Sequence, residues 1–303
     1  SNNYNLDRDQ KHTLRDRTFK GWEIVDNTAR LCVMNLYLHG IGGASTPLGT
    51  GSESPVEVND ALISDPGKRF DMALTNPPFG KKSSVTIVNG EGKAERDALT
   101  YERDDFWATT SNKQLNFVQH IATLLEIQGR AAVVVPDNVL FEGGAGETVR
   151  RRLLQGFDVH TLLRLPTGIF YAQGVKANVL FFDKKPGREK PWTEKVWIYD
   201  LRTNKHFTLK TDQMGYADLE DFIKCYNPEN RHQRQESERF RALTYNEIIQ
   251  RDKVSLDIFW LKDESLEDTE NLPDPDVLAE EIVASLQAAL LQFENIAEEL
   301  GEE

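Results

Sequence analysis

The sequence predicts an α/β fold, with an open, doubly wound and mostly parallel sheet and a helical extension at its C-terminal end. Short apolar runs alternate with segments of helical periodicity, which is the pattern of strand–helix–strand units. The run at 131–135 is apolar throughout, as is typical of a parallel strand buried on both faces. Polar or proline residues follow several of these runs, at the ends where open sheets of this class bind ligands.

Each predicted element follows from the local pattern. The expected strands cover 19–24, the run that stops at Asn76, 131–135, 159–165, 178–182 and 195–201. The expected helices cover 28–38, 112–125, a segment through 150–152 and 274–300. Residues 1–18 are polar and charged and are interpreted as a surface segment or a cloning remnant. Residues 81–112 are polar and weakly patterned, and we expect them to form a mobile excursion beside the site.

The C-terminal segment 273–303 is predicted to form one acidic helix after a mixed, polar linker at 206–272. Asp274 is a suitable N-cap, and Pro275 suits the first helical position. The apolar residues of this helix recur at alternating spacings of three and four, which is the seam of a coiled coil. They are Ala279, Ile282, Leu286, Ala289, Phe293, Ile296 and Leu300. The helix either packs on its own domain or binds a partner chain.

Acidic residues are concentrated at that end of the chain. The 303-residue chain has a net charge of -13, and residues 261–303 hold 14 Asp or Glu and one Lys. Residues 1–260 are therefore neutral, with 35 basic and 35 acidic side chains. A protein that binds DNA tightly on its own is more often basic. If this chain acts on DNA, we expect a partner to supply much of the affinity.

Composition also excludes several classes of protein. No apolar run approaches the roughly 18 residues of a membrane span, and the N-terminus has no signal-peptide pattern. The two cysteines, Cys32 and Cys225, lie far apart and lack the spacing of metal ligands. We therefore expect a cytoplasmic protein with no metal site, no disulfide framework and no membrane segment.

Residues Asn76-Pro77-Pro78-Phe79 follow the apolar run 72–74 and are predicted to form a stiff, non-helical loop at the end of a strand. The Asn76 side-chain oxygen and the Pro77 carbonyl can accept both hydrogens of a planar amino group, such as the exocyclic nitrogen of adenine. This would direct the nitrogen lone pair toward an electrophilic methyl group, so that positioning replaces a strong base. Phe79 offers a face on which a flipped-out base can stack.

Four residues are expected at strand carboxyl ends on one shared edge: Glu23, Asp60, Asn76 and Pro136. An ordinary strand-ending turn at 76–79 is the alternative to a catalytic loop. That alternative does not account for the coincidence of polar residues at neighbouring strand ends.

With these residues in place, the chain resembles the Rossmann-like, S-adenosylmethionine-dependent amino methyltransferases that carry an Asn-Pro-Pro-aromatic loop. It is similar in particular to the methyltransferase (modification) subunits of type I restriction–modification systems, which are N6-adenine DNA methylases. The resemblance covers residues 19–205, which it identifies as a methyltransferase domain. The matching stretches are 34–40, 74–80, 110–115, 129–143 and 165–182.

The resemblance implies a role for each candidate cofactor residue. Glu23 would bind the ribose hydroxyls of S-adenosylmethionine, and Ile24 would pack on its adenine ring. Asp60 would accept a hydrogen bond from the cofactor's adenine amino group, with Leu62 alongside.

The same resemblance implies that 76–79 acts on an adenine of DNA. Phe170, with Tyr171 as second choice, is the candidate for the opposite face of the flipped base, and plain loop packing is the alternative for Phe170. The implied partners are DNA, a separate specificity subunit that reads the sequence, a second methyltransferase subunit and a restriction subunit. The neutral core and the C-terminal helix fit such an assembly.

One feature of the family has no match here. A glycine-rich cofactor loop, after the central strand, is expected upstream of Glu23, but residues 2–19 contain no glycine. The family's N-terminal helical domain is also missing, so the chain resembles a fragment with an incomplete sheet and exposed strand edges. We expect this fragment alone to bind S-adenosylmethionine weakly or not at all and to be inactive, and we assign catalysis to the parent protein.

Two other functions fit parts of the sequence. A methyltransferase of the same fold could act on RNA adenine or on protein glutamine, because both present planar amino groups. A non-catalytic scaffold would act only through the acidic C-terminal helix, but it would have no need of the loop at 76–79. Methyl transfer to RNA or protein, with none to duplex DNA, would favour the first of these.

Overall fold

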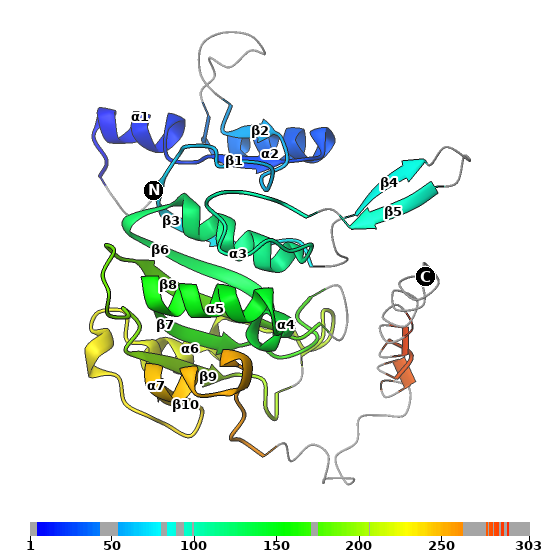
Figure 1. Ribbon diagram of the computed structural model, residues 1–303. Coiled ribbons are helices and arrows are strands. Elements are labelled where there is room, and N and C mark those ends of the chain that lie inside the picture. Colours follow the sequence, from blue (N-terminus) through cyan, green and yellow to red (C-terminus); the bar gives the residue numbers. More distant parts are fainter. Residues whose placement is uncertain are drawn as a thin grey trace. The chain divides into compact units, whose positions relative to one another are not determined.

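The chain forms two compact units, Ser1–Ser64 and Asp65–Glu303. The computed structural model describes residues 5–42, 54–79, 84–88, 94–98, 100–170, 175–205 and 207–262, together with 277, 279, 280, 282–284, 286, 287 and 290 of the C-terminal segment. Figure 1 shows the elements of both units along the sequence. None of the helices among these residues is both long and apolar enough to cross a membrane.

The first unit contains a short parallel pair of strands and two helices. Strands β1 (Gly21–Glu23) and β2 (Val56–Val58) pair so that Glu23 lies opposite Val58. Helix α2 (Asp26–Leu38) matches the helix predicted at 28–38, and its N-cap is Val25. Helix α1 (Arg8–Asp16) lies in the segment predicted to be at the surface, and it buries none of its residues.

A six-stranded sheet forms the centre of the second unit, in the order β10-β9-β7-β8-β6-β3. Its strands are β3 (Phe70–Thr75), β6 (Leu125–Pro136), β7 (Phe157–Arg164), β8 (Ala177–Lys184), β9 (Lys195–Asp200) and β10 (Phe240–Thr244). The α/β class is confirmed. The sheet is mixed, however, and not mostly parallel as predicted.

The direction of β8 explains that difference. β3 pairs parallel with β6, and β7 pairs parallel with β9. β8 lies between β6 and β7 and is antiparallel to both, and β10 is antiparallel to β9. β3, β6, β7 and β9 therefore share one direction, and their carboxyl ends lie along one edge. An apolar run does not reveal strand direction, because a buried strand has the same composition whichever way it runs.

Helices cover both faces of this sheet (Figure 1). They are α3 (Lys113–Leu124), α4 (Asp137–Phe141), α5 (Ala145–Gly156), α6 (Tyr216–Tyr226) and α7 (Tyr245–Ile249). One core combines α3, α5 and α7 with one face of β6, β7, β8 and β9, and the other combines α6 with the opposite face. Burial of these two apolar faces is the main stabilising term.

The helix predicted at 112–125 and the strand predicted at 131–135 are confirmed. Asn112 caps α3, because its Oδ1 accepts from the backbone N–H of Gln114 at 3.0 Å and of Leu115 at 3.2 Å. The apolar run at 131–135 lies inside β6, where Val133 and Val135 are fully buried.

Other segments contain more secondary structure than their polar composition suggests. Within 81–112, strands β4 (Ser84–Val88) and β5 (Ala94–Ala98) form an antiparallel hairpin. The region 206–272, predicted as mixed and polar, supplies α6, β10 and α7. Of the predicted C-terminal helix, the described positions between 277 and 290 are helical, and its remaining residues lie outside the described part of the chain.

Arg202 connects three strand ends at the carboxyl edge of the sheet. Its guanidinium donates to both carboxylate oxygens of Asp137, each at 2.9 Å, just after β6. It also donates to the carbonyl of Ala177 at 3.2 Å, where β8 begins, and to the carbonyl of Leu165 at 3.1 Å, just after β7. Asn178 donates to Asp137 at 2.8 Å as well. A planar guanidinium with five donors suits such a convergent set of acceptors.

This network controls the charge of Asp137. Burial alone would raise the pKa of the Asp137 carboxyl, but hydrogen bonds from Arg202 and Asn178 outweigh it, and the pKa is lowered overall. A carboxylate whose pKa is lowered on folding stabilises the folded state at pH values above its pKa in the unfolded chain. That stabilisation is lost as the pH falls through its pKa in the folded protein.

The loop after β7 has a second constraint at Gly168. Its φ is +82°, in the left-handed region, and a Cβ atom at this position would lie 1.8 Å from the backbone oxygen of Phe207. Only glycine fits both the conformation and the space. The loop that begins at Leu165 is thus held by Arg202 at its start and by close backbone packing at Gly168.

We predict that Arg202→Lys lowers the free energy of unfolding by about 2–3 kcal/mol at pH 7, because an ammonium cannot replace the bidentate contact. Urea unfolding measures this, with the exposed Arg152→Lys on α5 as the matched control. The difference between Arg202→Lys and the wild type should begin to shrink as the pH falls below about 4, the ordinary pKa of a carboxyl group, and should disappear as the pH passes through the lowered pKa of Asp137. Equal stability of the two variants at pH 7 would contradict this role for Arg202.

We also predict that Gly168→Ala destabilises the second unit by about 2 kcal/mol or more, because the loop must leave its present conformation. Gly187→Ala is the control, since a Cβ atom at Gly187 meets nothing within 4 Å. If both alanine variants unfold at the same urea concentration, the described loop conformation is wrong.

Candidate active site

The loop Asn76-Pro77-Pro78-Phe79 follows β3 at the carboxyl edge of the six-stranded sheet, as predicted. Thr75, the last residue of β3, pairs with Val133 of β6. Asn76 is exposed, and its side chain makes no hydrogen bond with other residues that the structure describes. Pro77 is buried and Pro78 is exposed. The amide of Asn76 is therefore available to a ligand, while the backbone beside it is held by the buried ring of Pro77.

Phe79 and Phe170 contact each other although they come from different loops. Their ring centroids lie 5.9 Å apart and the ring planes meet at 80°, which is an edge-to-face arrangement. Both rings are partly buried against the core cluster that contains α6. The structure thus brings the two predicted stacking residues to one place. Tyr171, the second choice, lies outside the described residues.

The present geometry of the two rings does not form a slot for a base. A ring held between two others needs them parallel and about 7 Å apart, which is twice the usual carbon–carbon contact distance. Phe79 and Phe170 are close to perpendicular, so at least one ring must turn before a base can lie between them. Side-chain rotation of this kind is fast compared with loop or domain motion.

The two candidate cofactor carboxylates belong to the first unit and lie at the carboxyl ends of its paired strands. Glu23 ends β1, and Asp60 follows β2 by two residues. The backbone N–H of Asn59 donates to the carbonyl of Glu23 at 3.1 Å, which joins the two strand ends. The parallel pairing of β1 and β2 therefore places both carboxylates at one edge of this pair. Asn76 and Pro136, which were predicted on the same edge, belong instead to the six-stranded sheet of the other unit.

Local hydrogen bonds orient these carboxylates. Glu23 Oε1 accepts from the backbone N–H of Val25 at 2.9 Å, at the start of α2. Asp60 Oδ1 accepts from the backbone N–H of Leu62 at 2.9 Å. Oε2 of Glu23 makes no hydrogen bond with the described residues, so it can accept from a ligand hydroxyl.

The two apolar candidates differ in exposure. Ile24 is 65% exposed, so its side chain can contact a ligand. Leu62 is 2% exposed, which leaves its side chain almost no surface for a direct contact. The site residues thus form two groups, one in each unit: Glu23, Ile24, Asp60 and Leu62 in the first, and 76–79 with Phe170 in the second.

Sequence reasoning missed the residues that support the second group. Asp137 and Arg202 each follow a strand at its carboxyl end, which was the available signal, but they lie far apart in the chain. Asp200 directs Arg202 into place, because its Oδ1 accepts from the backbone N–H groups of Arg202 and Thr203, each at 2.8 Å. Among the described residues, no group of three or more His, Cys, Asp or Glu could hold a metal ion.

Comparison with known proteins agrees with this geometry. A family model described as N-6 DNA Methylase matches residues 3–262. The type I restriction enzyme StySJI methylase subunit of Salmonella typhimurium is 40% identical over 98% of this chain and 59% of its own length. The EcoKI methylase subunit of Escherichia coli is 38% identical with the same coverage.

Solved structures show the same relationship. The crystal structure of the type I restriction enzyme EcoKI M protein has a TM-score of 0.70 and 37% identity, and the match covers 98% of this chain and 63% of that one. A modification subunit of a type I enzyme from Vibrio vulnificus has a TM-score of 0.61 and 25% identity over 80% of this chain and 46% of its own. The present chain spans 59% of the length of the two curated relatives from Salmonella typhimurium and Escherichia coli. It belongs to the N6 DNA methylase family, among the methylase subunits of type I restriction enzymes.

Proposed function

We propose that this chain is the part of a type I methylase subunit that transfers a methyl group from S-adenosylmethionine to N6 of a flipped-out adenine in DNA. The observation that carries the proposal is the Asn76-Pro77-Pro78-Phe79 loop at the carboxyl end of β3, with the Phe79 ring against Phe170. The family membership of the chain supports the same reaction.

The chemistry follows from the acceptors of the loop. The amino nitrogen of adenine is a weak nucleophile because its lone pair is delocalised into the ring. Asn76 Oδ1 and the Pro77 carbonyl would accept its two hydrogens and orient the lone pair. No strong base is needed, because the two acceptors stabilise the positive charge that develops on the nitrogen in the transition state. The exposed amide of Asn76, which makes no hydrogen bond within the described part of the chain, is suited to this task.

Phe79 and Phe170 would hold the base. Base–aromatic stacking contributes about 1–3 kcal/mol per base, which helps to offset the cost of flipping. In the present structure the two rings contact each other edge to face. Entry of adenine would exchange this contact for stacking, so the two rings shield each other from water until a base arrives.

Cofactor binding would use the first unit. S-adenosylmethionine, when bound, supplies the electrophilic methyl group. Glu23 fits the ribose hydroxyls, because its Oε1 accepts from the Val25 N–H while its Oε2 has no hydrogen-bond donor among the described residues. Asp60 would accept from the adenine amino group, and the exposed side chain of Ile24 would cover the adenine ring. We assign Leu62 a supporting role, since its backbone N–H orients Asp60 and its side chain is buried.

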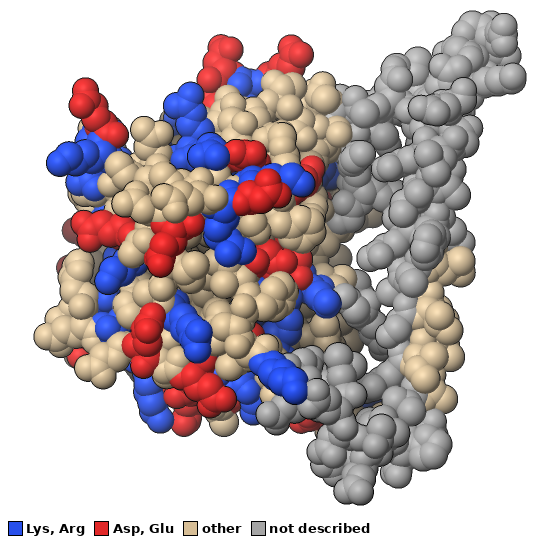
Figure 2. All heavy atoms as spheres, turned by 60° about the horizontal axis from the view of Figure 1, so that its bottom comes forward, with Lys and Arg blue, Asp and Glu red and all other residues tan. Residues whose placement is uncertain are grey.

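The surface charge supports an assembly with other subunits. Figure 2 shows basic and acidic side chains interspersed over the face in view, with neither sign forming an extended patch. This agrees with the neutral composition of residues 1–260. We propose that a specificity subunit supplies sequence recognition and much of the DNA affinity, and that a second methylase subunit and a restriction subunit complete the complex.

The C-terminal helix is our candidate for the contact with partner subunits. Ile282, Leu286 and Leu290 are spaced four residues apart on described helical positions, and they are 51%, 64% and 58% exposed. Residues with this spacing lie on one face of a helix, and an exposed apolar stripe of this kind is typical of a helix that packs on another chain.

Asn76→Ala tests the reaction directly. In the full-length subunit assembled with its specificity partner, we expect methyl transfer to duplex DNA to fall by about 100-fold or more, because one acceptor of the amino group is lost. The readout is incorporation of radiolabelled methyl groups from S-adenosylmethionine, with N6-methyladenine identified in the digested product.

The matched control is Asn246→Ala, at an exposed position of α7. Both variants should assemble and melt like the wild type, and the control should retain its rate. Wild-type methylation by the Asn76→Ala variant would refute the proposed role of the loop. Methylation of RNA or protein, with none of duplex DNA, would show that the acceptor is a different planar amino group.

A further inference from the structure

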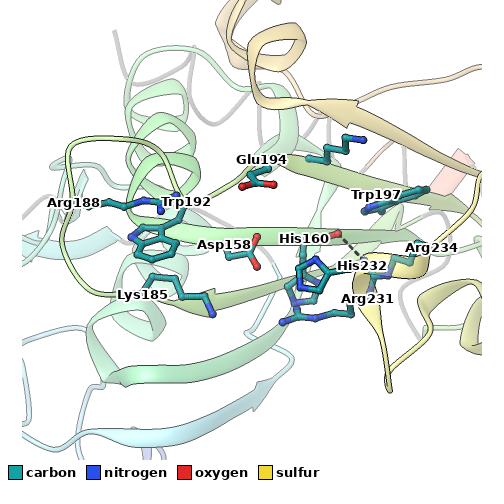
Figure 3. Close-up of a pocket in the computed structure, with 11 residues that line it drawn as sticks. Asp158, His160, Lys185, Arg188, Trp192, Glu194, Trp197, Arg231, His232 and Arg234 are labelled. Carbon is teal, nitrogen blue, oxygen red and sulfur yellow. Dashed lines mark hydrogen bonds between the residues drawn. The ribbon is translucent and has the colours of Figure 1, made fainter.

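A cavity of about 530 Å³ lies at the edge of the six-stranded sheet opposite the Asn76 loop. Figure 3 shows that it opens around the start of β7, the end of β8 and the start of β9. These ends point away from the carboxyl edge, because β7 and β9 share the direction of β3 and β6 whereas β8 runs opposite. The proposed methylation chemistry uses none of the residues that line this cavity.

The lining is predominantly cationic. Lys185, Arg188, Lys195, Arg231 and Arg234 line the cavity together with only two carboxylates, those of Asp158 and Glu194. Asp183 offsets part of this charge, because it pairs with Arg231 and lies 3.8 Å from Lys185. Lys195 is exposed and forms no ion pair with other residues in the described part of the chain.

Arg234 adds a cation at the wall that is held in place. It is 8% exposed, and its Nε donates to the carbonyl of Tyr226 at 2.7 Å. Its Nη1 donates to the carbonyl of His160 at 3.2 Å, drawn as a dashed line in Figure 3, and to Thr161 Oγ1 at 3.0 Å. Its acceptors are thus carbonyl and hydroxyl oxygens and not carboxylates, so its charge is not neutralised by a direct partner among the described residues.

Protonation at neutral pH preserves this positive charge. Burial lowers the pKa of the Arg234 guanidinium to about 10, which leaves it protonated at neutral pH. Burial also lowers the pKa of His160. The positive charge of the cavity therefore comes from its lysines and arginines and not from this histidine.

Two tryptophans give the cavity flat apolar surfaces. Trp197 lines the cavity, and one of its faces stacks on Phe240 at a centroid distance of 4.8 Å and an angle of 23°. Trp192 is covered on one face by the Arg188 guanidinium, 3.4 Å from the ring centroid, and its Nε1 donates to the carbonyl of Pro186 at 2.7 Å. Both rings are therefore fixed before any ligand binds.

We propose that this cavity binds a nucleoside phosphate, either as a free nucleotide or as one unit of a single-stranded nucleic acid. The phosphate would be bound by Lys185 and Lys195, and the base would stack on the face of Trp197 that does not contact Phe240. Cationic side chains beside an aromatic platform are the features by which proteins hold nucleotides irrespective of sequence. The volume lies within the range of small-molecule sites, which fits one nucleotide and not a folded partner. The proposal is independent of the methylation chemistry, because it uses the opposite edge of the sheet.

The test is calorimetric titration of the whole chain with thymidine 5′-monophosphate, thymidine, inorganic phosphate and a short single-stranded oligothymidylate. Pyrimidine probes are chosen because a purine could also enter the cofactor site. The test variant is Lys185→Gln/Lys195→Gln. The matched control is Lys210→Gln/Lys224→Gln, which removes two exposed lysines that do not line the cavity.

We expect thymidine 5′-monophosphate to bind more tightly than thymidine or phosphate. The test variant should weaken its binding by about tenfold or more, and the control by less than about twofold. If the oligothymidylate binds more tightly than the monophosphate, and the test variant weakens both to the same extent, the natural ligand is a nucleic acid strand. If the two probes bind with equal affinity, the natural ligand is a free nucleotide. The proposal fails if the monophosphate and the oligothymidylate do not bind at millimolar concentration. It also fails if phosphate binds as tightly as the nucleotide, or if both double variants behave alike.

Discussion

The contact between Arg202 and Asp137 is the interaction on which the catalytic edge of the sheet depends. It joins the end of β6 to the start of β8 and to the loop that leaves β7. Neither side chain could remain charged and largely buried without the other, since each would then lose its solvation without compensation. The loop that begins at Leu165 carries Phe170, so one ion pair indirectly determines where an aromatic ring meets Phe79.

At the carboxyl edge of the sheet, the backbone of the site is therefore fixed, whereas the side chains that would touch a base can turn. The backbone is fixed by the buried ring of Pro77, by Gly168 against Phe207 and by the guanidinium of Arg202. The side chains that would touch a base, Asn76 and the two phenylalanines, make no hydrogen bonds with the residues that the structure describes. Such a site can keep the Pro77 carbonyl in position while the Asn76 side chain and the two rings turn to admit a substrate. At the other edge of the sheet, the cationic cavity has no part in this arrangement, so the two edges can serve different ligands.

Much of this could be predicted from the sequence, because the signals were local. The helix at 112–125, the apolar run of β6 and the proline loop after β3 each depend on a few neighbouring residues. The grouping of Glu23 with Asp60, and of Phe79 with Phe170, also follows from residues at strand ends or in the loops after them. The direction of β8 could not be predicted, because its apolar residues suit either direction. The Arg202–Asp137 pair and the left-handed conformation of Gly168 could not be predicted, because each depends on a contact between residues that lie far apart in the sequence. The hairpin of β4 and β5 was missed because its composition is polar.

The central claim is that the loop at 76–79 binds the amino group of an adenine that stacks on Phe79. The most direct measurement is a structure of the full-length subunit with its specificity partner, duplex DNA and S-adenosylhomocysteine. The account predicts a flipped adenine whose N6 lies within hydrogen-bond distance, about 2.7–3.2 Å, of both Asn76 Oδ1 and the Pro77 carbonyl, with Phe79 and Phe170 no longer in edge-to-face contact. A flipped adenine bound elsewhere, or one that leaves the two rings as they are, would contradict it.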